Sequence, residues 1–317
     1  MRHIHSLADA NLDGPSMVTI GVFDGVHRGH QHVVAQLVTA AKAARATSAV
    51  LTFHPHPALV IRGPQPRHYL TMPDEKAALL HALGVELVVT HPFDDEVRHI
   101  RAAAFVDRLL SHLRMAELWV GADFAMGYQR EGDVDFLKAQ AKEKGFALRV
   151  VDLMDAGGER VSSSRVRSAL AAGDVAEATY CLGRPFRLGG EVVLGDRRGG
   201  RTIGFPTANL ALAEERAIPA RGVYAAWAWV GGQRVPSVVN VGVRPTFDST
   251  ERTIVEAHLL DFEADLYGQQ LTLDFLARLR GEQRFDGVPE LQAQIGRDIE
   301  QARRIFAQAE HAGRESA

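Results

Sequence analysis

The sequence predicts two domains: an α/β domain with a Rossmann-like parallel sheet, followed by a small antiparallel β-barrel with a terminal helix. Its 317 residues are enough for two domains of about 150 residues each. Up to residue 182, short β-branched runs alternate with helix-length stretches, which indicates a parallel sheet with crossover helices. Beyond it, glycine-punctuated strands follow each other directly, which favours a barrel. We therefore expect domains at 1–183 and 184–317.

Strands and helices are expected to alternate along the first domain. The strands are expected at 17–23, 49–53, 85–90, 117–121 and 146–153, and the helices at 30–45, 73–83, 102–113 and 134–144. Each expected strand is a short apolar run, and the stretches between them are long enough to cross back over a parallel sheet.

The second domain is expected to consist of strands and one helix. The strands are expected at 187–194, 222–230, 234–241, 253–262 and 270–279. Both faces of 222–230 are apolar, which predicts a central position in the barrel. Beyond Pro289, apolar residues recur at steps of three to four, which predicts an amphipathic helix lying on this domain.

Composition and charge argue against several classes of protein. Hydrophobic residues make up 46% of the chain and charged residues 24%, as in globular domains. The formal net charge of −3 leaves no positive excess for a nucleic-acid backbone or an acidic membrane. Cys181 is the single cysteine, and neither an 18-residue apolar run nor an export signal occurs. We expect a cytoplasmic protein without a nucleic-acid, membrane or obligatory protein partner.

The segment 21–30 combines glycines and histidines between an expected strand and an expected helix. This is where α/β sheets bind phosphate ligands. Gly21, Gly25 and Gly29 allow a ligand to approach the backbone, and His27 and His30 can face one anion. The alternative is a glycine-rich turn with two solvent-exposed histidines.

A second polar segment lies at 160–167, just before another helical stretch. Ser162, Ser163 and Ser164 are flanked by Arg160 and Arg167. Hydroxyl groups, a helix N-terminus and guanidinium groups together can bind a triphosphate. By itself the serine run indicates only a helix N-cap.

The segment 195–202 nearly matches a Walker A loop, with Arg201 in place of lysine. Pro206 and the glycines beside it exclude the helix that a Walker loop requires. In an extended chain, Thr207 and Asn209 share one side and offer hard oxygen ligands suited to a Mg²⁺–nucleotide complex. A turn held by side-chain hydrogen bonds is the alternative.

A carboxylate stands within an expected strand of the second domain. Glu256 shares a strand face with Ile254, His258 and Leu260, which predicts a partly buried position. Such a carboxylate can serve as a general base. Spacing alone favours a solvent-exposed carboxylate on a barrel strand.

These segments resemble one family. The stretch GVFDGVHRGH at 21–30 resembles the signature of the nucleotidyltransferase superfamily, and RVSSSRVR at 160–167 resembles its I-S-S-T-x-I-R element, with Val161, Ser164 and Val166 as departures. GFPTAN at 204–209 resembles the most specific motif of riboflavin kinases, and the later segments follow in that family's order. Over nearly its whole length the sequence is similar to bacterial bifunctional riboflavin kinase/FMN adenylyltransferases, the prokaryotic FAD synthetases.

The resemblance implies two ATP-dependent transferase activities. The barrel domain would transfer the γ-phosphoryl group of ATP to riboflavin, giving FMN. The first domain would join FMN to AMP from a second ATP, giving FAD and pyrophosphate. Riboflavin, FMN, FAD and ATP are thus the expected ligands, with Mg²⁺ accompanying ATP and the flavins as substrate and product.

The same resemblance implies roles for particular residues. Glu256 would be the kinase base, and His27 and His30 would stabilise the reacting phosphates in adenylyl transfer. Asp123 and Phe124 would contact the flavin. The neighbouring Ala125-Met126-Gly127 departs from the commoner x-F-G, which affects the expected shape of that pocket. The remaining residues bind ATP: Gly21, Phe23, Asp24, Gly25, Arg160, Ser162, Ser163, Ser164 and Arg167 in the first domain, and Arg201, Thr207 and Asn209 in the second, where Thr207 and Asn209 also hold the metal.

Two other classes of protein stay open. Twelve of the 14 histidines lie within the first 112 residues, and His54-Pro55-His56 at a strand end is a pattern found in metal-dependent hydrolases. Other ligands at recognisable places are missing, and the prolines fit the T-F-x-P-H-P stretch of flavin nucleotidyltransferases. The other class is a flavin- or nucleotide-binding regulator without catalytic turnover. It is disfavoured because both sets of candidate reactive residues keep the residue types that the two reactions need.

Overall fold

A computed structural model describes residues 1–63, 65, 67–152, 155–156, 159–194, 204–245 and 251–315. The chain divides into two compact units, Met1–Ser163 and Ser164–Ala317. Each is described by itself below. Within the described parts of the chain, no helix combines the length and the apolar character needed to cross a membrane.

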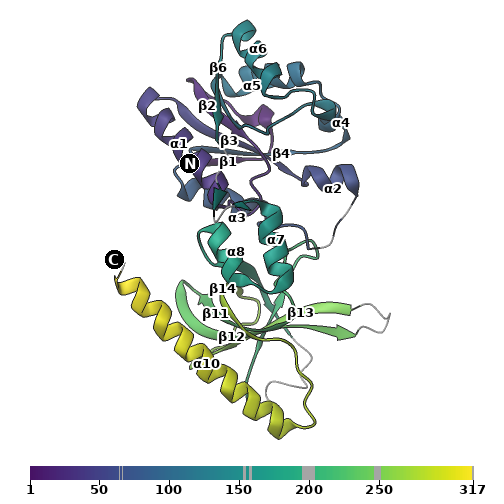
Figure 1. Cartoon of the computed structure of the whole chain (residues 1–317), viewed down its shortest axis with the longest axis vertical. Helices are drawn as coiled ribbons and strands as arrows, with labels where there is room; N and C mark the ends of the chain where they lie inside the picture. Colours follow the sequence, from purple (N-terminus) through teal and green to yellow (C-terminus); the bar gives the residue numbers. More distant parts are fainter. Residues whose placement is uncertain are drawn as a thin grey trace. The chain divides into compact units, whose positions relative to one another are not determined.

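The first unit contains a six-stranded sheet in which every neighbouring pair is parallel, as predicted (Figure 1). The strand order is β1-β4-β3-β2-β5-β6. After β2 the chain adds strands on one side, then returns to place β5 on the other side of β2. This reversal creates a topological switch point at the carboxyl ends of β2 and β5. The strands are β1 (Arg2–Ile4), β2 (Ser16–Ile20), β3 (Thr47–His54), β4 (Leu87–Pro92), β5 (Met115–Gly121) and β6 (Ala147–Val151).

Helices cover both faces of this sheet, because strands buried on two sides need apolar partners on each. Helices α1 (Arg28–Ala44) and α3 (Pro73–Ala82) pack on the face that carries Val50, Val88 and Trp119. Helices α5 (Ala102–Leu113) and α6 (Val134–Lys144) contribute to the core on the opposite face. Shorter elements complete the unit: η1 (Leu7–Asp9), α2 (Pro57–Arg62), α4 (Asp95–Arg98), η2 (Tyr128–Arg130), β7 (Asp155–Ala156) and β8 (Glu159–Arg160).

The second unit contains a closed six-stranded barrel, which confirms the predicted antiparallel barrel. Around the barrel the order is β10-β13-β12-β11-β14-β9. Helices α7 (Ser163–Ala172) and α8 (Val175–Leu182) precede it, and α10 (Val288–Glu315) follows it. The strands are β9 (Phe186–Val193), β10 (Ala208–Ala211), β11 (Gly222–Val230), β12 (Gln233–Pro245), β13 (Glu251–Leu259) and β14 (Gln270–Arg280).

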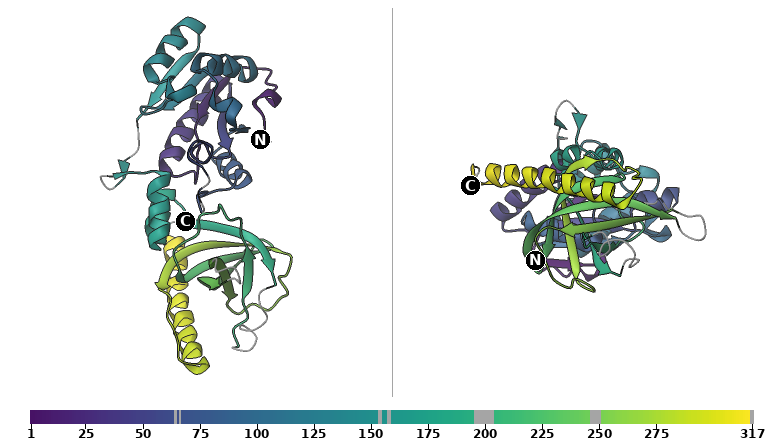
Figure 2. Two further views of the ribbon diagram at one scale, coloured as in Figure 1. Left: turned by 90° about the vertical axis from the view of Figure 1, so that its right-hand side faces the viewer. Right: turned by 90° about the horizontal axis from the view of Figure 1, so that it is seen from below.

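Strand β11 is buried on both faces, as its sequence predicts. On one face, the ring of Tyr224 packs edge-on against Phe275 at 5.4 Å inside the barrel. On the other face, Trp227 packs against Phe306 of α10, with ring centroids 4.5 Å apart. Figures 1 and 2 both show α10, in yellow, running along the barrel. The terminal helix therefore completes a second apolar layer outside the barrel.

A buried carboxylate fastens three barrel strands together. Asp274 on β14 is 7% exposed and accepts hydrogen bonds from Nε and Nη2 of Arg187 on β9, at 2.6 and 2.7 Å. It also accepts a bond from Nε1 of Trp229 on β11, at 2.7 Å. Charged hydrogen bonds of this length are among the stronger ones in proteins.

The structure differs from the sequence-based expectations at short elements and at strand ends. Strands β1 and β10 and helices α2 and α8 were not expected, because they are three to eight residues long and carry little periodicity. The strand expected at 17–23 ends at Ile20. Phe23 has a φ of 50°, which is incompatible with a continuing strand.

The predicted boundary at 183/184 stays a prediction, and the packing of the preceding helices bears on it. Within the second unit, α8 packs on β9 and β14. The N–H of Ala220 donates to the carbonyl of Leu170 on α7 at 2.8 Å, and Nη1 of Arg278 donates to that of Ala172. Residues before 184 thus contribute to the stability of the barrel.

The Asp274 network predicts a loss of stability on truncation. Asp274→Ala leaves the Trp229 N–H and the Arg187 guanidinium without their acceptor, so we expect the free energy of unfolding of the second unit to fall by about 2 kcal/mol. Urea denaturation followed by tryptophan fluorescence measures this. Glu263→Ala, at an exposed position, is the control. An unchanged midpoint for Asp274→Ala would show that the network contributes nothing.

The packing of α7 and α8 predicts a difference between two fragments. A fragment beginning at Ser164 should unfold at a higher urea concentration than one beginning at Arg184, because only the longer fragment covers the surface of β9 and β14 that α8 buries. Circular dichroism during denaturation of both purified fragments measures the difference. Equal midpoints would mean that α7 and α8 do not stabilise the barrel.

Candidate active sites

The first candidate site lies in the loop between β2 and α1, at the switch point of the parallel sheet. This loop, residues 21–27, contains Phe23, Gly25 and Val26, which have φ angles of 50°, 80° and 42°. Positive φ is costly for Phe and especially for the β-branched Val. Such a loop persists only when surrounding bonds hold it in place.

Asp24 supplies several of those bonds. Its side chain is 2% exposed and accepts hydrogen bonds from the N–H groups of Leu70 and Thr71, both at 3.0 Å. The hydroxyl of Thr71 in turn accepts a bond from the N–H of Gly25 at 3.0 Å. The carboxylate of Asp24 thus faces the backbone at 70–71, and its predicted place in the nucleotide site stays a prediction.

His27 and His30 form a stacked pair at the start of α1. Their ring centroids are 3.6 Å apart and their planes differ by 19°. His27 is the N-cap of α1, and its Nδ1 accepts a long hydrogen bond, 3.4 Å, from the N–H of His30. Gly29 allows this arrangement, because a Cβ there would lie 3.2 Å from the His27 ring.

His30 is the side chain best suited to meet a ligand. Its buried Nδ1 has no hydrogen-bond partner among the residues that the structure describes. Burial lowers the pKa of His30 well below its usual value, and the neighbouring His27, Lys76 and Arg160 lower it further. The imidazole is therefore neutral at pH 7, and a bound anion would favour its protonated form.

The segment at 160–163 lies against this loop although it is far away in the sequence. The hydroxyl of Ser163 donates to the carbonyl of Asp24 at 2.8 Å. Arg160 forms an ion pair with Asp123, in the loop after β5, at 2.8 Å. The loops that follow β2 and β5 are therefore both joined to this segment, as the switch point predicts.

The other predicted residues of the first site differ in their surroundings. Phe124 is partly buried and packs on the core of the sheet. Ser162 is partly buried at the end of the first unit. Ser164 and Arg167 lie in α7 and belong to the second unit, where Ser164 is exposed and Arg167 is partly buried.

Lys76 is a residue of this region that sequence reasoning missed. It lies on α3, is 4% exposed, and its ammonium donates to the carbonyl of Val22 in the 21–27 loop at 3.0 Å. The sequence held a signal, since Lys76, Leu80 and Leu83 are spaced for one helix face. A lysine in such an apolar stripe is usually solvated at its tip, so the spacing alone did not mark it.

The histidines of the first half are also candidates for a metal centre. Among the described residues, the one group of three candidate ligands is His3, His5 and Asp74, which lies at the edge strand β1, three places from β2 in the sheet. His54 and His56 are not part of it. The N–H of His56 donates to the hydroxyl of Tyr69, and its Nδ1 accepts the N–H of Ala58 at the start of α2. These contacts give His56 a structural role.

The second candidate site is a cavity of about 720 Å³ in the second unit. Thr207, Asn209 and Glu256 all line it. Strand register brings the last two together, because Glu256 on β13 is paired with Asn209 on β10. On its other side Glu256 is paired with Asn240 on β12, which also lines the cavity and was missed in the sequence. Arg201 lies outside the described residues.

His258 holds the segment that carries Thr207. Its Nδ1 is 2.8 Å from the carbonyl of Pro206, and its ring meets that of Phe205 edge-on at 5.5 Å. Both rings line the cavity. This contact fixes the GFPTAN segment against β13, next to Glu256.

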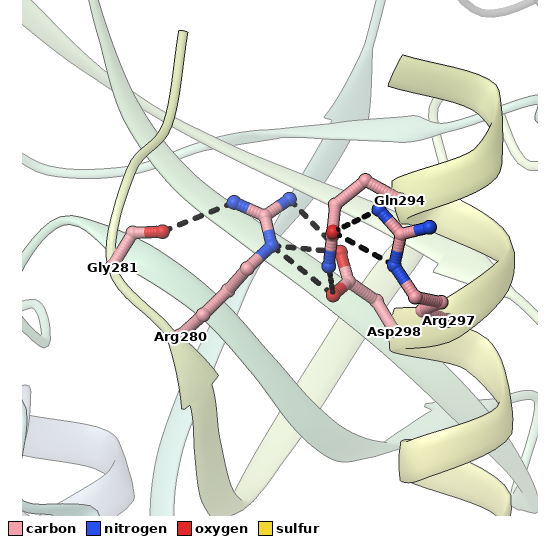
Figure 3. Close-up of polar contacts among 5 residues, drawn as sticks. All are labelled: Arg280, Gly281, Gln294, Arg297 and Asp298. Atoms are coloured by element: carbon pink, nitrogen blue, oxygen red, sulfur yellow. Dashed lines mark hydrogen bonds and ion pairs between the residues drawn. The ribbon is translucent and has the colours of Figure 1, made fainter. Parts of the chain in front are cut away.

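An ion pair joins the end of β14 to α10 at the cavity wall (Figure 3). Nε of Arg280 donates to both carboxylate oxygens of Asp298, at 3.1 and 3.0 Å, and its Nη1 donates to the carbonyl of Gly281. Gln294 donates to Asp298 at 2.8 Å and accepts from Arg297. Asp298 is 3% exposed. The network fixes where the 281–287 connection leaves the barrel, and periodicity could not reveal it.

Two family models match consecutive parts of the chain. The FAD synthetase model matches residues 9–165, which include every predicted residue of the first site except Arg167. The riboflavin kinase model matches residues 182–306, which include the whole lining of the cavity. Most of α8 lies between the two matches.

Several relatives and one solved structure match nearly the whole chain. A bifunctional riboflavin kinase/FMN adenylyltransferase of Pseudomonas fluorescens is 40% identical over 98% of this chain and 99% of its own. Those of Escherichia coli (strain K12) and Bacillus subtilis are 40% and 35% identical, over 96% and 92% of this chain and 97% and 93% of their own.

A crystal structure from Streptococcus pneumoniae, described as a macrolide-efflux protein, has a TM-score of 0.86 with 30% identity. It covers 95% of this chain and 98% of its own. This likeness concerns the fold. Together, the two family models and the full-length relatives show that the chain belongs to the bifunctional riboflavin kinase/FMN adenylyltransferase family.

Proposed function

We propose that this chain phosphorylates riboflavin with ATP to give FMN and then adenylylates FMN with a second ATP to give FAD and pyrophosphate. The observation that carries the proposal is the distribution of reactive residues: a histidine pair at the switch point of one unit, and a carboxylate with hydroxyl and amide groups around a cavity in the other. The matches to both family models support the same division. Family membership also supports a cytoplasmic location.

In the kinase reaction, Glu256 acts as the general base. It takes the proton from the 5′-hydroxyl of the ribityl chain while the oxygen attacks the γ-phosphorus of ATP, and ADP leaves. The cavity supports this role, because Glu256 is partly buried among groups that can orient both substrates. In phosphoryl transfer, positioning and charge neutralisation account for most of the catalysis.

Thr207 and Asn209 are the residues proposed to hold Mg²⁺ with ATP in the kinase site. A hydroxyl and an amide oxygen beside a carboxylate form the hard-oxygen donor set that this ion accepts. Bound Mg²⁺ would supply charge neutralisation at the phosphates. Arg201 stays a proposed nucleotide contact.

In the adenylyl transfer, a phosphate oxygen of FMN attacks the α-phosphorus of ATP and pyrophosphate leaves. Both substrates are anions, so the first site must bring positive charge and hydrogen-bond donors to them. We assign this to His27 and His30, with Gly21, Phe23, Asp24 and Gly25 shaping the loop. The triphosphate would be held by Arg160, Ser162, Ser163, Ser164 and Arg167.

Arg160 and Asp123 connect the nucleotide and flavin halves of the first site. They are paired at 2.8 Å in the structure. Binding of phosphate by Arg160 would release Asp123, which we propose contacts the flavin together with Phe124. Binding of ATP would thereby make Asp123 available to the flavin.

Replacement of the proposed base tests the kinase half. Glu256→Gln keeps the size of the side chain but cannot accept the proton, so FMN formation should fall by about 10²- to 10⁴-fold. FAD formation from supplied FMN should stay within about twofold of wild type. Chromatography of both products measures this, with Glu263→Gln as the exposed control. An equal loss of both activities would contradict separate sites.

Replacement of His30 tests the adenylyl transfer half. His30→Ala removes the imidazole with the unsatisfied Nδ1, so FAD formation should fall by about 10²-fold or more, while riboflavin phosphorylation is unchanged. His32→Ala, exposed on the same helix, should behave as wild type. FAD synthesis by His30→Ala at close to the wild-type rate would rule out the proposed role of the pair.

A further inference from the structure

Lys76 is a buried cation beneath the first site. Its ammonium donates to the carbonyl of Val22 at 3.0 Å and to that of Phe53, at the end of β3, at 3.5 Å. One of these carbonyls lies just after β2, and the other lies near the carboxyl end of the neighbouring strand β3. Burial lowers the pKa of Lys76 to about 8, although the nearby charge of Asp24 opposes this.

The contact with Val22 leads directly to the histidine pair. The Val22 carbonyl accepts a second bond, 2.8 Å, from the hydroxyl of Thr52. The donors Thr52 and Lys76 together hold the plane of the Val22–Phe23 peptide. This peptide is one of the two that flank Phe23, whose φ is 50°. The Phe23 ring in turn lies 4.9 Å from that of His30. A shift of the peptide plane would therefore move the surface on which His30 rests.

The charge of Lys76 also acts at this site. Lys76 is one of the cations that lower the pKa of His30, after burial and His27. It faces Asp24 in the loop and is within electrostatic reach of His30 on α1 and His3 on β1. Asp24 accepts hydrogen bonds from the N–H groups of 70 and 71 and carries the opposite charge, so it offsets part of the charge of Lys76.

We propose that Lys76 is a positioning residue for adenylyl transfer: its buried ammonium holds the 21–27 loop through Val22 and adds positive charge behind His27 and His30, where the ATP phosphates bind. The proposal rests on the proposed function of this site. Burial of the lysine cation is costly, and Asp24 and the two carbonyls offset only part of that cost, because the pKa of Lys76 still falls to about 8. Its presence fits a site that must receive a polyanion.

Lys76→Met separates this role from a purely structural one. The kcat/KM for FAD formation from FMN, measured per folded molecule, should fall by about ten- to a hundredfold, while riboflavin phosphorylation is unchanged. Thr52→Val removes the other donor to the Val22 carbonyl without changing charge. Lys142→Met, at an exposed position on α6, should match wild type.

The pH dependence of kcat/KM supplies the second readout. Lys76 is protonated below its pKa of about 8, so wild type and Thr52→Val should lose FAD-forming activity as the pH rises through this value. The substrate phosphates are already ionised there, since their second pKa lies near 6. Lys76→Met should lack this alkaline limb, and Lys76→Arg should keep activity to higher pH. If Lys76→Arg does not fold, the comparison of wild type with Lys76→Met decides.

The outcomes distinguish this role from the proposed function. A wild-type chain that makes no FAD from FMN overturns the proposed function and the role of Lys76 with it. An active wild type with an equally active Lys76→Met overturns only the role of Lys76. So does a Lys76→Met variant whose activity falls only with its folded fraction, or whose alkaline limb equals that of wild type.

Discussion

The first site depends on one buried carboxylate, that of Asp24. The carboxylate oxygens accept hydrogen bonds from the N–H groups of Leu70 and Thr71. The backbone carbonyl of Asp24 accepts one from the hydroxyl of Ser163. Three segments that are far apart in the sequence thereby meet at the end of β2. Without the carboxylate, two buried N–H groups would lose their acceptor, and such groups are expensive to leave unsatisfied. This anchoring holds the loop that leads to the histidine pair.

The two sites are built on different principles. The first uses an unusual backbone at the switch point of a parallel sheet, with positive φ angles held by buried charges. The second uses ordinary strands whose register sets Glu256 between Asn209 and Asn240. In a barrel, a slip of one residue would turn Glu256 to the opposite face. The hydrogen bonds of the closed barrel and the ion pair of Arg280 with Asp298 therefore keep the residues of the second site in place, as Asp24 does in the first.

The long elements could be predicted from the sequence, and three residues that lie in its motifs, Thr207, Asn209 and Glu256, line one cavity. The run that forms β11 and the spacing of the helix at 102–113 predicted their places, because periodicity reports burial directly. The sequence could not reveal Asn240 or the pairing of Arg280 with Asp298, since strand register and helix docking bring them to the cavity. Spacing also could not show that the carboxylate of Asp24 accepts hydrogen bonds from the backbone at 70–71; its place in the nucleotide site stays a prediction.

Lys76 shows why such residues escape pattern analysis. A lysine on the apolar side of a helix usually extends its ammonium to water and covers apolar surface with its stem. Here the carbonyls of Val22 and Phe53 offer acceptors inside the protein, so the ammonium stays buried. The carbonyl of Val22 is available because the chain leaves β2 in a conformation that no regular strand adopts. The unusual loop and the buried cation therefore require each other, and neither can be understood from its own segment of sequence.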